Sequence, residues 1–190
     1  MEKQDIMLYS LDELKEYLNS IGEKPFRAKQ IYEWLHQKLV ECFDDMTNIS
    51  NNLKEKLNND FYIQSLEMVQ VLTSKIDGTQ KFLFRLNDGN VIESVLMRYK
   101  HGNSVCISTQ VGCRMGCRFC ASTLDGLVRN LKPSEMLEEI YYIQRYSKER
   151  VSNIVLMGSG EPMDNFDNVL AFVKTISDEN GLHISQRNIT

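Results

Sequence analysis

The stretch Ser104-Val-Cys-Ile-Ser-Thr-Gln110-Val-Gly-Cys113-Arg-Met-Gly-Cys117-Arg-Phe-Cys120 joins a strand pattern to a loop that holds three cysteines. Ser104–Gln110 has the pattern of a β-strand, Pro133–Tyr146 has the period of an amphipathic helix, and Asn153–Met157 is a short apolar strand. A strand, a helix and a second strand in this order predict βα units with parallel strands.

Two chemically distinctive segments follow the carboxyl ends of these strands. The cysteine loop follows the first strand, and Gly158-Ser-Gly-Glu-Pro162 follows the second. Because the carboxyl ends of parallel strands meet at one edge of the sheet, we expect both segments on the same face. A glycine-rich turn alone is most often just a turn. Beside the cysteine loop, its glycines would let the backbone approach a ligand and Glu161 could accept hydrogen bonds from an ammonium group.

The spacing Cys113-x3-Cys117-x2-Cys120 places three thiols in one short loop. A structural zinc site normally closes with four protein ligands, whereas an iron–sulfur cluster held by three thiolates leaves one iron open. The competing interpretation is a zinc-binding loop with Cys106 or His101 as the fourth ligand. The spacing favours the cluster, because zinc folds usually contain C-x2-C pairs.

The remaining segments complete an α/β fold class. Residues 1–60 read as helices, with a possible capping box at Ser10 and Glu13. Period-two alternation and two Asp-Gly turns predict an antiparallel meander, with strands at 66–73, 80–86 and 91–97. A further helix is expected at Asn165–Ser177 and a further strand at Leu182–Thr190. We therefore expect a helical domain (1–60), an antiparallel β extension (61–100) and an incomplete βα core (101–190) that looks truncated.

Composition narrows the class of protein. The chain has no apolar run of the ~20 residues that span a bilayer, and its N-terminus lacks a signal-peptide core, so a cytosolic location is expected. In that reducing compartment, five cysteines indicate metal binding or catalysis rather than a disulfide framework. Cys42 lies among helical residues, and we expect it to be a small buried apolar side chain rather than a ligand.

Charge is distributed unevenly along the chain. The net charge is −4, yet residues 98–132 carry six basic side chains and one acidic one. A basic rim around the cysteine loop would favour a polyanion such as nucleic acid. Pairing of these arginines with nearby carboxylates is an equally good explanation.

Several motifs, in the same order along the chain, resemble the RlmN family of radical S-adenosylmethionine enzymes. The cysteine spacing with Phe119 before the last cysteine is similar to the cluster loop of radical S-adenosylmethionine enzymes. The other matching segments are Phe26-Arg-Ala-Lys-Gln-Ile31, Asp45-Met-Thr47, Asp77-Gly-Thr79, Ile92-Glu93, Cys106, Gln110-Val-Gly-Cys113 and Met157-Gly-Ser-Gly-Glu-Pro162.

The resemblance implies a partial (β/α) radical S-adenosylmethionine barrel that methylates C2 of adenosine in 23S rRNA and tRNA. It implies a 4Fe–4S cluster on Cys113, Cys117 and Cys120, and S-adenosylmethionine bound at Gly160 and Glu161. In the family, an adenosyl radical takes hydrogen from a methyl group carried on a cysteine near the C-terminus. The carbon radical adds to adenine, and a second cysteine resolves the protein–RNA crosslink by forming a disulfide.

By the same resemblance, Cys106 is the resolving cysteine with a transient disulfide, and Glu93 is the proton acceptor. Without the resemblance, the sequence pattern indicates that Cys106 is a small apolar residue on a strand. Glu93 shares a strand face with Val91 and Val95, where apolar surroundings would suit a general base at neutral pH. An exposed strand glutamate is an equally good reading of Glu93.

Two departures from the family pattern matter. Ser159 replaces the methionine usual in the Gly-x-Gly-Glu turn, a change the backbone-mediated contacts should tolerate. The methyl-carrying cysteine is absent, so we expect this chain alone to be inactive, and incorporation of labelled methyl into RNA would contradict that expectation.

Other functions stay open. Adenine C8 methylation by the sister family is the nearest, although Pro162 favours the C2 enzymes. A non-catalytic zinc and RNA-binding module would need four closed ligands. An electron carrier is disfavoured because carriers usually saturate every iron with thiolate. The expected partners are RNA and a low-potential donor such as flavodoxin or ferredoxin, with the protein a monomer.

Overall fold

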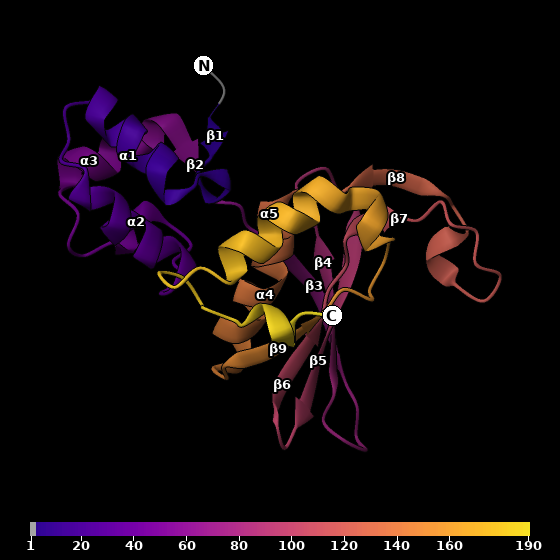
Figure 1. Cartoon of the computed structure of the whole chain (residues 1–190). Helices are drawn as coiled ribbons and strands as arrows, with labels where there is room; N and C mark the ends of the chain where they lie inside the picture. The colour runs from indigo at the N-terminus through magenta and orange to yellow at the C-terminus, as the bar shows by residue number, and fades with distance from the viewer. Residues whose placement is uncertain (1–2) are drawn as a thin grey trace. The chain divides into compact units, whose positions relative to one another are not determined.

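The computed structural model describes residues 3–190, which divide into two compact units. The first comprises the residues up to Gln64 together with Thr175–His183, and the second comprises Ser65–Lys174 and Ile184–Thr190. Figure 1 shows the course of the chain through its helices and strands. The chain is an α/β protein, as the sequence predicts.

The first unit is mainly helical. Its helices are α1 (Leu11–Ser20), α2 (Phe26–His36) and α3 (Asn51–Asp60), and the short strands β1 (Gln4–Asp5) and β2 (Phe61–Tyr62) pair in parallel. The capping box predicted at the start of α1 is present, because the Ser10 side chain accepts from the Glu13 N–H and the Glu13 carboxylate accepts from the Ser10 N–H. Apolar side chains at helical spacing fill the core of this unit, among them Leu14, Leu18, Ile31, Leu35, Leu53 and Leu57.

The second unit contains one mixed sheet. Its order is β3-β4-β5-β6-β9, and only the β6–β9 pair is parallel. The predicted meander therefore continues directly into the first parallel strand. The strands are β3 (Glu67–Thr73), β4 (Gln80–Arg85), β5 (Val91–Tyr99), β6 (Gly102–Cys106) and β9 (Val151–Val155).

Helix α4 (Pro133–Ser147) precedes β9 in the chain and covers one face of this sheet. The Phe84 ring meets the Tyr142 ring edge-on at 5.0 Å, and Phe82 meets Tyr146 at 5.4 Å. Alternation along the strands places the other residues of the buried face, which include Ile92, Leu96, Val105 and Ile154. Helix α5 (Phe166–Ile176) follows β9.

Two details differ from the sequence prediction. The chain does not continue as one strand to Gln110: β6 ends at Cys106, and β7 (Gln110–Gly112) pairs instead with β8 (Leu127–Asn130), which the sequence did not reveal. The strand predicted at Leu182–Thr190 is wrong in extent. A 3-10 turn occupies Gln186–Asn188, where the Ser185 hydroxyl caps it, and a single bridge joins Ile189 to Ile154. Within residues 3–190, no helix has both the length and the apolar character needed to cross a membrane.

Replacing Ile154 by Val should lower the free energy of unfolding by about 0.5–1.5 kcal/mol, because Ile154 is fully buried and the lost methylene leaves a small cavity. Ile76→Val is the matched control, since Ile76 is 97% exposed in the β3–β4 turn. Urea denaturation of both variants checks this. An equal decrease in the free energy of unfolding of the two variants would contradict the burial of Ile154 in the sheet.

Candidate functional site

The carboxyl ends of β6 and β9 are joined by backbone hydrogen bonds beyond the last paired residues. The Ile107 N–H donates to the Val155 carbonyl at 3.0 Å, and the Gly158 N–H donates to the Ile107 carbonyl at 3.0 Å. A Cβ atom on Gly158 would lie 2.6 Å from the Ile107 carbonyl oxygen, so this close approach requires glycine. The Gly158–Glu161 turn is thus attached directly to the segment that leaves β6.

The cysteine loop runs from β7 to β8 and is closed at its base by two glycines (Figure 1, right). The Cys113 N–H donates to the Gly126 carbonyl at 3.0 Å. Gly112, at φ +73°, lies so close that its Cβ would fall 2.0 Å from the same carbonyl oxygen. The Ser122 and Ser159 hydroxyl oxygens are 3.1 Å apart, so the cysteine loop also reaches the Gly158–Glu161 turn. The two segments predicted to share a face do lie together.

The three loop cysteines are not gathered around one point. Cys113 is buried at the base of the loop, Cys117 is exposed and Cys120 is intermediate. Across residues 3–190, no three Cys, His, Asp or Glu side chains are placed so that they could hold one metal ion. The donor set itself fits an iron–sulfur cluster, because the loop offers three soft thiols and a single carboxylate, that of Asp125. Gly116, at φ +69°, gives the loop a turn between the first two thiols.

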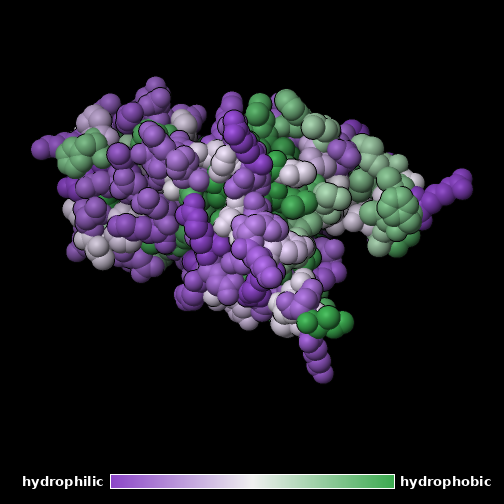
Figure 2. Space-filling model, turned by 60° about the horizontal axis from the view of Figure 1, so that its bottom comes forward, coloured by the Kyte–Doolittle hydropathy of each residue, from purple (hydrophilic) through white to green (hydrophobic). Residues whose placement is uncertain are grey.

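The loop also presents apolar side chains to solvent. Phe119 is 95% exposed and Leu124 is 81% exposed. Figure 2 shows the corresponding lobe, at the right of the view, largely in green. Other exposed apolar residues of this region are Met115, Val128, Met157 and Met163. Exposed apolar side chains gathered in this way are typical of an interaction or ligand-binding surface.

Glu93 and Cys106 lie on the same face of the sheet. Val95 is the registered partner of Cys106, and Glu93 stands two residues before Val95 on β5. This face is opposite to the one that α4 covers. The apolar surroundings expected for Glu93 are wrong: its side chain is 41% exposed and forms an ion pair with Lys81 of β4. The cross-strand pairing of β4 with β5 brings that cation to the same face.

Cys106 is a half-buried thiol. Burial raises its pKa, and the nearby carboxyl groups of Glu139 and Glu93 raise it further, although a backbone hydrogen bond from Met157 acts in the opposite direction. The thiol form is therefore favoured over the reactive thiolate. All five cysteines are free, so the structure does not support the disulfide expected at Cys106.

A buried carboxyl group that the sequence analysis did not select lies next to the site. Glu139 of α4 is fully buried, and it accepts hydrogen bonds from the Ser94 hydroxyl and, at 3.0 Å, from the Ser108 N–H. Its Oε1 atom has no hydrogen-bond partner. Burial raises the pKa of Glu139 well above its ordinary value of 4.5. The burial of Glu139 could have been predicted from the sequence, because this residue falls within the apolar stripe formed by Met136, Ile140 and Ile143.

Most arginines of the positive segment are paired with carboxylates. Arg98 binds Glu149 at 2.8 Å, and Arg114 binds Asp164. Arg129 of β8 binds Glu135 at the start of α4 and Asp88 in the β4–β5 turn. The hydrogen bond from Arg129 is the main reason that the pKa of Asp88 falls to about 2. The sequence analysis left two explanations for the positive segment, binding of a polyanion and pairing with nearby carboxylates. Pairing with carboxylates accounts for these three arginines.

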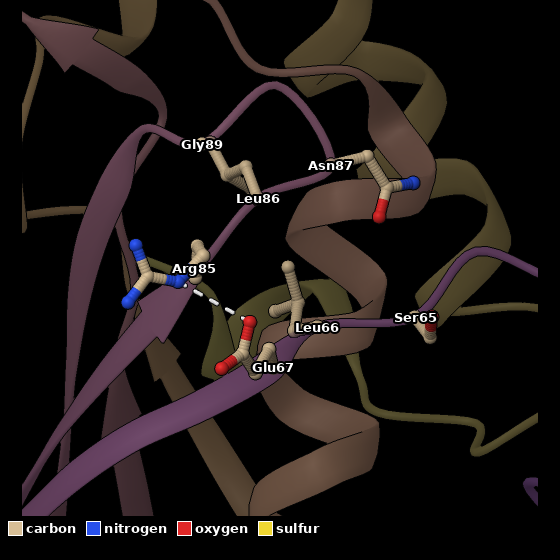
Figure 3. A pocket seen from close by; sticks show the side chains of 7 residues that line it. All are labelled: Ser65, Leu66, Glu67, Arg85, Leu86, Asn87 and Gly89. Carbon is tan, nitrogen blue, oxygen red and sulfur yellow. Dashed lines mark ion pairs between the residues drawn. The ribbon is translucent and has the colours of Figure 1, made fainter.

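A pocket of about 400 Å³ lies elsewhere in the second unit (Figure 3). Its lining includes Arg85 and Glu67, which form an ion pair at 3.2 Å. None of the predicted site residues lines it. This hollow therefore does not coincide with the site at the strand ends.

Comparisons with known proteins agree with the geometry. Residues 4–63 match the family described as "Ribosomal RNA large subunit methyltransferase N-terminal domain", and residues 107–188 match the "Radical SAM superfamily". The chain is 65% identical, over its whole length, to a "Probable dual-specificity RNA methyltransferase RlmN" of Lachnoclostridium phytofermentans, and it covers 53% of that protein. A protein of the same description from Lachnospira eligens is 62% identical over 98% of the chain, which covers 53% of it.

A solved structure matches as well. The "Crystal Structure of a radical SAM methyltransferase from Sphaerobacter thermophilus" superposes with a TM-score of 0.90 at 36% identity, covering 98% of this chain and 55% of that one. The chain spans about half the length of the curated relatives it matches.

The free energy of unfolding of Glu139→Gln should increase, relative to that of the unchanged protein, as pH rises. The folded protein keeps the Glu139 proton above pH 4.5, where the unfolded chain releases it. The stability that this proton contributes is complete below that pH. As pH rises from 4.5 to the raised pKa of Glu139 in the folded protein, this stability is lost, by at most about 1.4 kcal/mol per pH unit. Gln has no such proton to lose. Urea denaturation at pH 5, 6, 7 and 8 measures the difference, and a constant difference would contradict a neutral buried Glu139.

Proposed function

Because the chain belongs to the RlmN family, we propose that it is the amino-terminal part of a radical S-adenosylmethionine methyltransferase acting on C2 of adenosine in 23S rRNA and tRNA. One observation carries the proposal. The cysteine loop and the Gly158–Glu161 turn are joined at the ends of neighbouring parallel strands. This arrangement puts candidate cluster ligands beside a turn whose four residues are all partly exposed.

Cys113, Cys117 and Cys120 would hold the 4Fe–4S cluster, which when bound supplies the electron that cleaves S-adenosylmethionine. Their loop is tethered at its base by Cys113 and Gly126, while Cys117 lies in its exposed part. Gathering the thiols then needs movement of the outer loop only. A low-potential flavodoxin or ferredoxin is the reductant we propose.

Gly160 and Glu161 would bind the amino acid moiety of S-adenosylmethionine. Gly160 adopts φ +107°, a conformation that disfavours any side chain. The Glu161 carboxylate accepts from the Met163 N–H at 3.1 Å, which fixes its direction. A partly exposed, oriented carboxylate is suited to accept hydrogen bonds from the substrate ammonium group.

Glu93 and Cys106 would act on the adenine adduct. They share the sheet face that α4 does not cover, so one bound base could meet both. Glu93 would accept the proton that C2 releases, and Lys81 would hold its carboxylate in place. Cys106 would resolve the crosslink, and its raised pKa keeps the thiol inert until then.

The alternatives receive less support. A closed zinc site would need a fourth ligand, and His101 stacks on Tyr99 at the start of β6, the opposite end from the cysteine loop. That strand of five residues is about 16 Å long, which is too far for one metal. Methylation at adenine C8 is the nearest alternative reaction, and product analysis separates it from methylation at C2.

Cys117→Ser should abolish iron uptake beyond background, because the cluster would lose one of three thiolate ligands. Cys42→Ser is the matched control, since Cys42 lies in the helical unit. The expectation that Cys42 is buried is wrong, because its side chain is exposed. The measurement is iron and sulfide content after anaerobic reconstitution, with about four irons expected for the unchanged chain and for the control. Stoichiometric zinc without iron would overturn the cluster assignment.

Joining residues 1–190 to the remainder of the Lachnoclostridium phytofermentans relative should give an active chimera. We expect 2-methyladenosine in 23S rRNA and tRNA fragments, detected by mass spectrometry of nucleosides. Glu93→Gln in the chimera should slow turnover strongly, because the proton acceptor is removed. Formation of 8-methyladenosine would replace the proposed product with that of the sister family.

A further inference from the structure

The geometry points to Gln110 as a positioning residue that fixes the cysteine loop and the Gly158–Glu161 turn relative to each other. Gln110 belongs to the Gln110-Val-Gly-Cys113 motif but has no part in the proposed chemistry. It is fully buried where β7 begins, three residues before Cys113. Its significance for the cofactor rests on the proposed function, whereas its effect on the loop does not.

Every polar atom of the Gln110 side chain is used. Oε1 accepts from the Glu161 N–H at 2.9 Å. Nε2 donates to Asn130 Oδ1 at 2.8 Å and to Asp164 Oδ2 at 3.0 Å. A buried amide with these partners fixes both its own orientation and theirs, since any unmade bond would leave a buried polar group unsatisfied.

The partners of Gln110 come from each segment that must be held. Glu161 belongs to the turn proposed to bind S-adenosylmethionine, and Asn130 belongs to β8, the strand that closes the cysteine loop. Asp164 also binds Arg114, the residue that follows Cys113. One buried side chain therefore links the proposed ligand-binding turn to both ends of the cysteine loop.

The backbone and the shape of the turn add to this link. The Gln110 N–H donates to the Ser159 carbonyl at 3.1 Å. A Cβ atom on Gly160 would lie 2.6 Å from the Gln110 Cβ, so the turn rests directly on the stem of this side chain. A shift of Gln110 must move Gly160 and Glu161 with it.

The test uses Gln110→Glu, which preserves shape but removes both amide donors and sets a carboxylate against Asp164. In the metal-free chain, trypsin should cleave at Arg118 of the cysteine loop about tenfold faster. Cleavage at Lys75, in the β3–β4 turn, is the internal reference and should not change. Gln70→Glu, on an exposed part of β3, is the matched control. Equal cleavage at Arg118 in Gln110→Glu and the control would overturn the inference.

Adding Asp164→Asn to Gln110→Glu should restore slow cleavage, because the new amide can donate to the introduced carboxylate. Should Gln110→Glu fail to fold, Arg114→Gln tests the same link from the exposed side, where 65% of the Arg114 side chain is accessible. We expect faster cleavage at Arg118 in that variant too. Failure of the double substitution to slow cleavage, or an unchanged rate in Arg114→Gln, would contradict the inference.

A second readout addresses the cofactor. After anaerobic reconstitution, Gln110→Glu should keep its iron but need about tenfold more S-adenosylmethionine to perturb the spectrum of the reduced cluster. Unchanged affinity, or iron and affinity lost together, would contradict positioning of the turn. If the unchanged chain takes up no iron, the proposed function fails, and the proteolysis result still decides whether Gln110 holds the loop.

Discussion

The close backbone approach between Gly158 and Ile107 is the constraint on which the site depends. Parallel pairing of β6 with β9 alone would align the strands but leave their exit loops independent. Because Gly158 has no side chain, its N–H reaches the Ile107 carbonyl, and the Ser159 carbonyl then accepts from the N–H groups of Thr109 and Gln110. Two segments about fifty residues apart in sequence thereby become neighbours, and the cysteine loop is built from the same strand end.

Helix α4 fixes the other side of this arrangement through buried carboxyl groups. Glu135, Glu138 and Glu139 are all buried. Arg129 pairs with Glu135 and Arg145 pairs with Glu138, whereas Glu139 accepts hydrogen bonds from Ser94 and Ser108 at one oxygen and has no partner at the other. Buried charges are costly unless paired, so the helix can dock in one register only. The unpaired Glu139 avoids the cost by keeping its proton. Its donors lie on β5 and just beyond β6, the strands that carry Glu93 and Cys106.

Local patterns in the sequence predicted the helices, the meander and the side-by-side placement of the two loops, because periodicity and strand order determine them. The cysteines were found by spacing alone. Contacts between residues distant in sequence were not predictable in this way. Lys81 reaches Glu93 across a strand pair, and β8 forms by pairing with β7 across the cysteine loop, a contact that four residues of sequence do not reveal. The wrong extent of the last strand has a local cause instead, since the Ser185 hydroxyl caps a 3-10 turn that competes with extended backbone.

The ion pairs of Arg129 have a consequence for sequence variation among relatives. Hairpin turns usually tolerate insertions, and the Asp88-Gly89 turn would be an ordinary place for them. Here the Asp88 carboxylate is attached to a guanidinium that also binds the first turn of α4 and stands on the strand closing the cysteine loop. Lengthening this turn would pull on that strand. The β4–β5 turn should therefore be nearly constant in length among relatives of this chain.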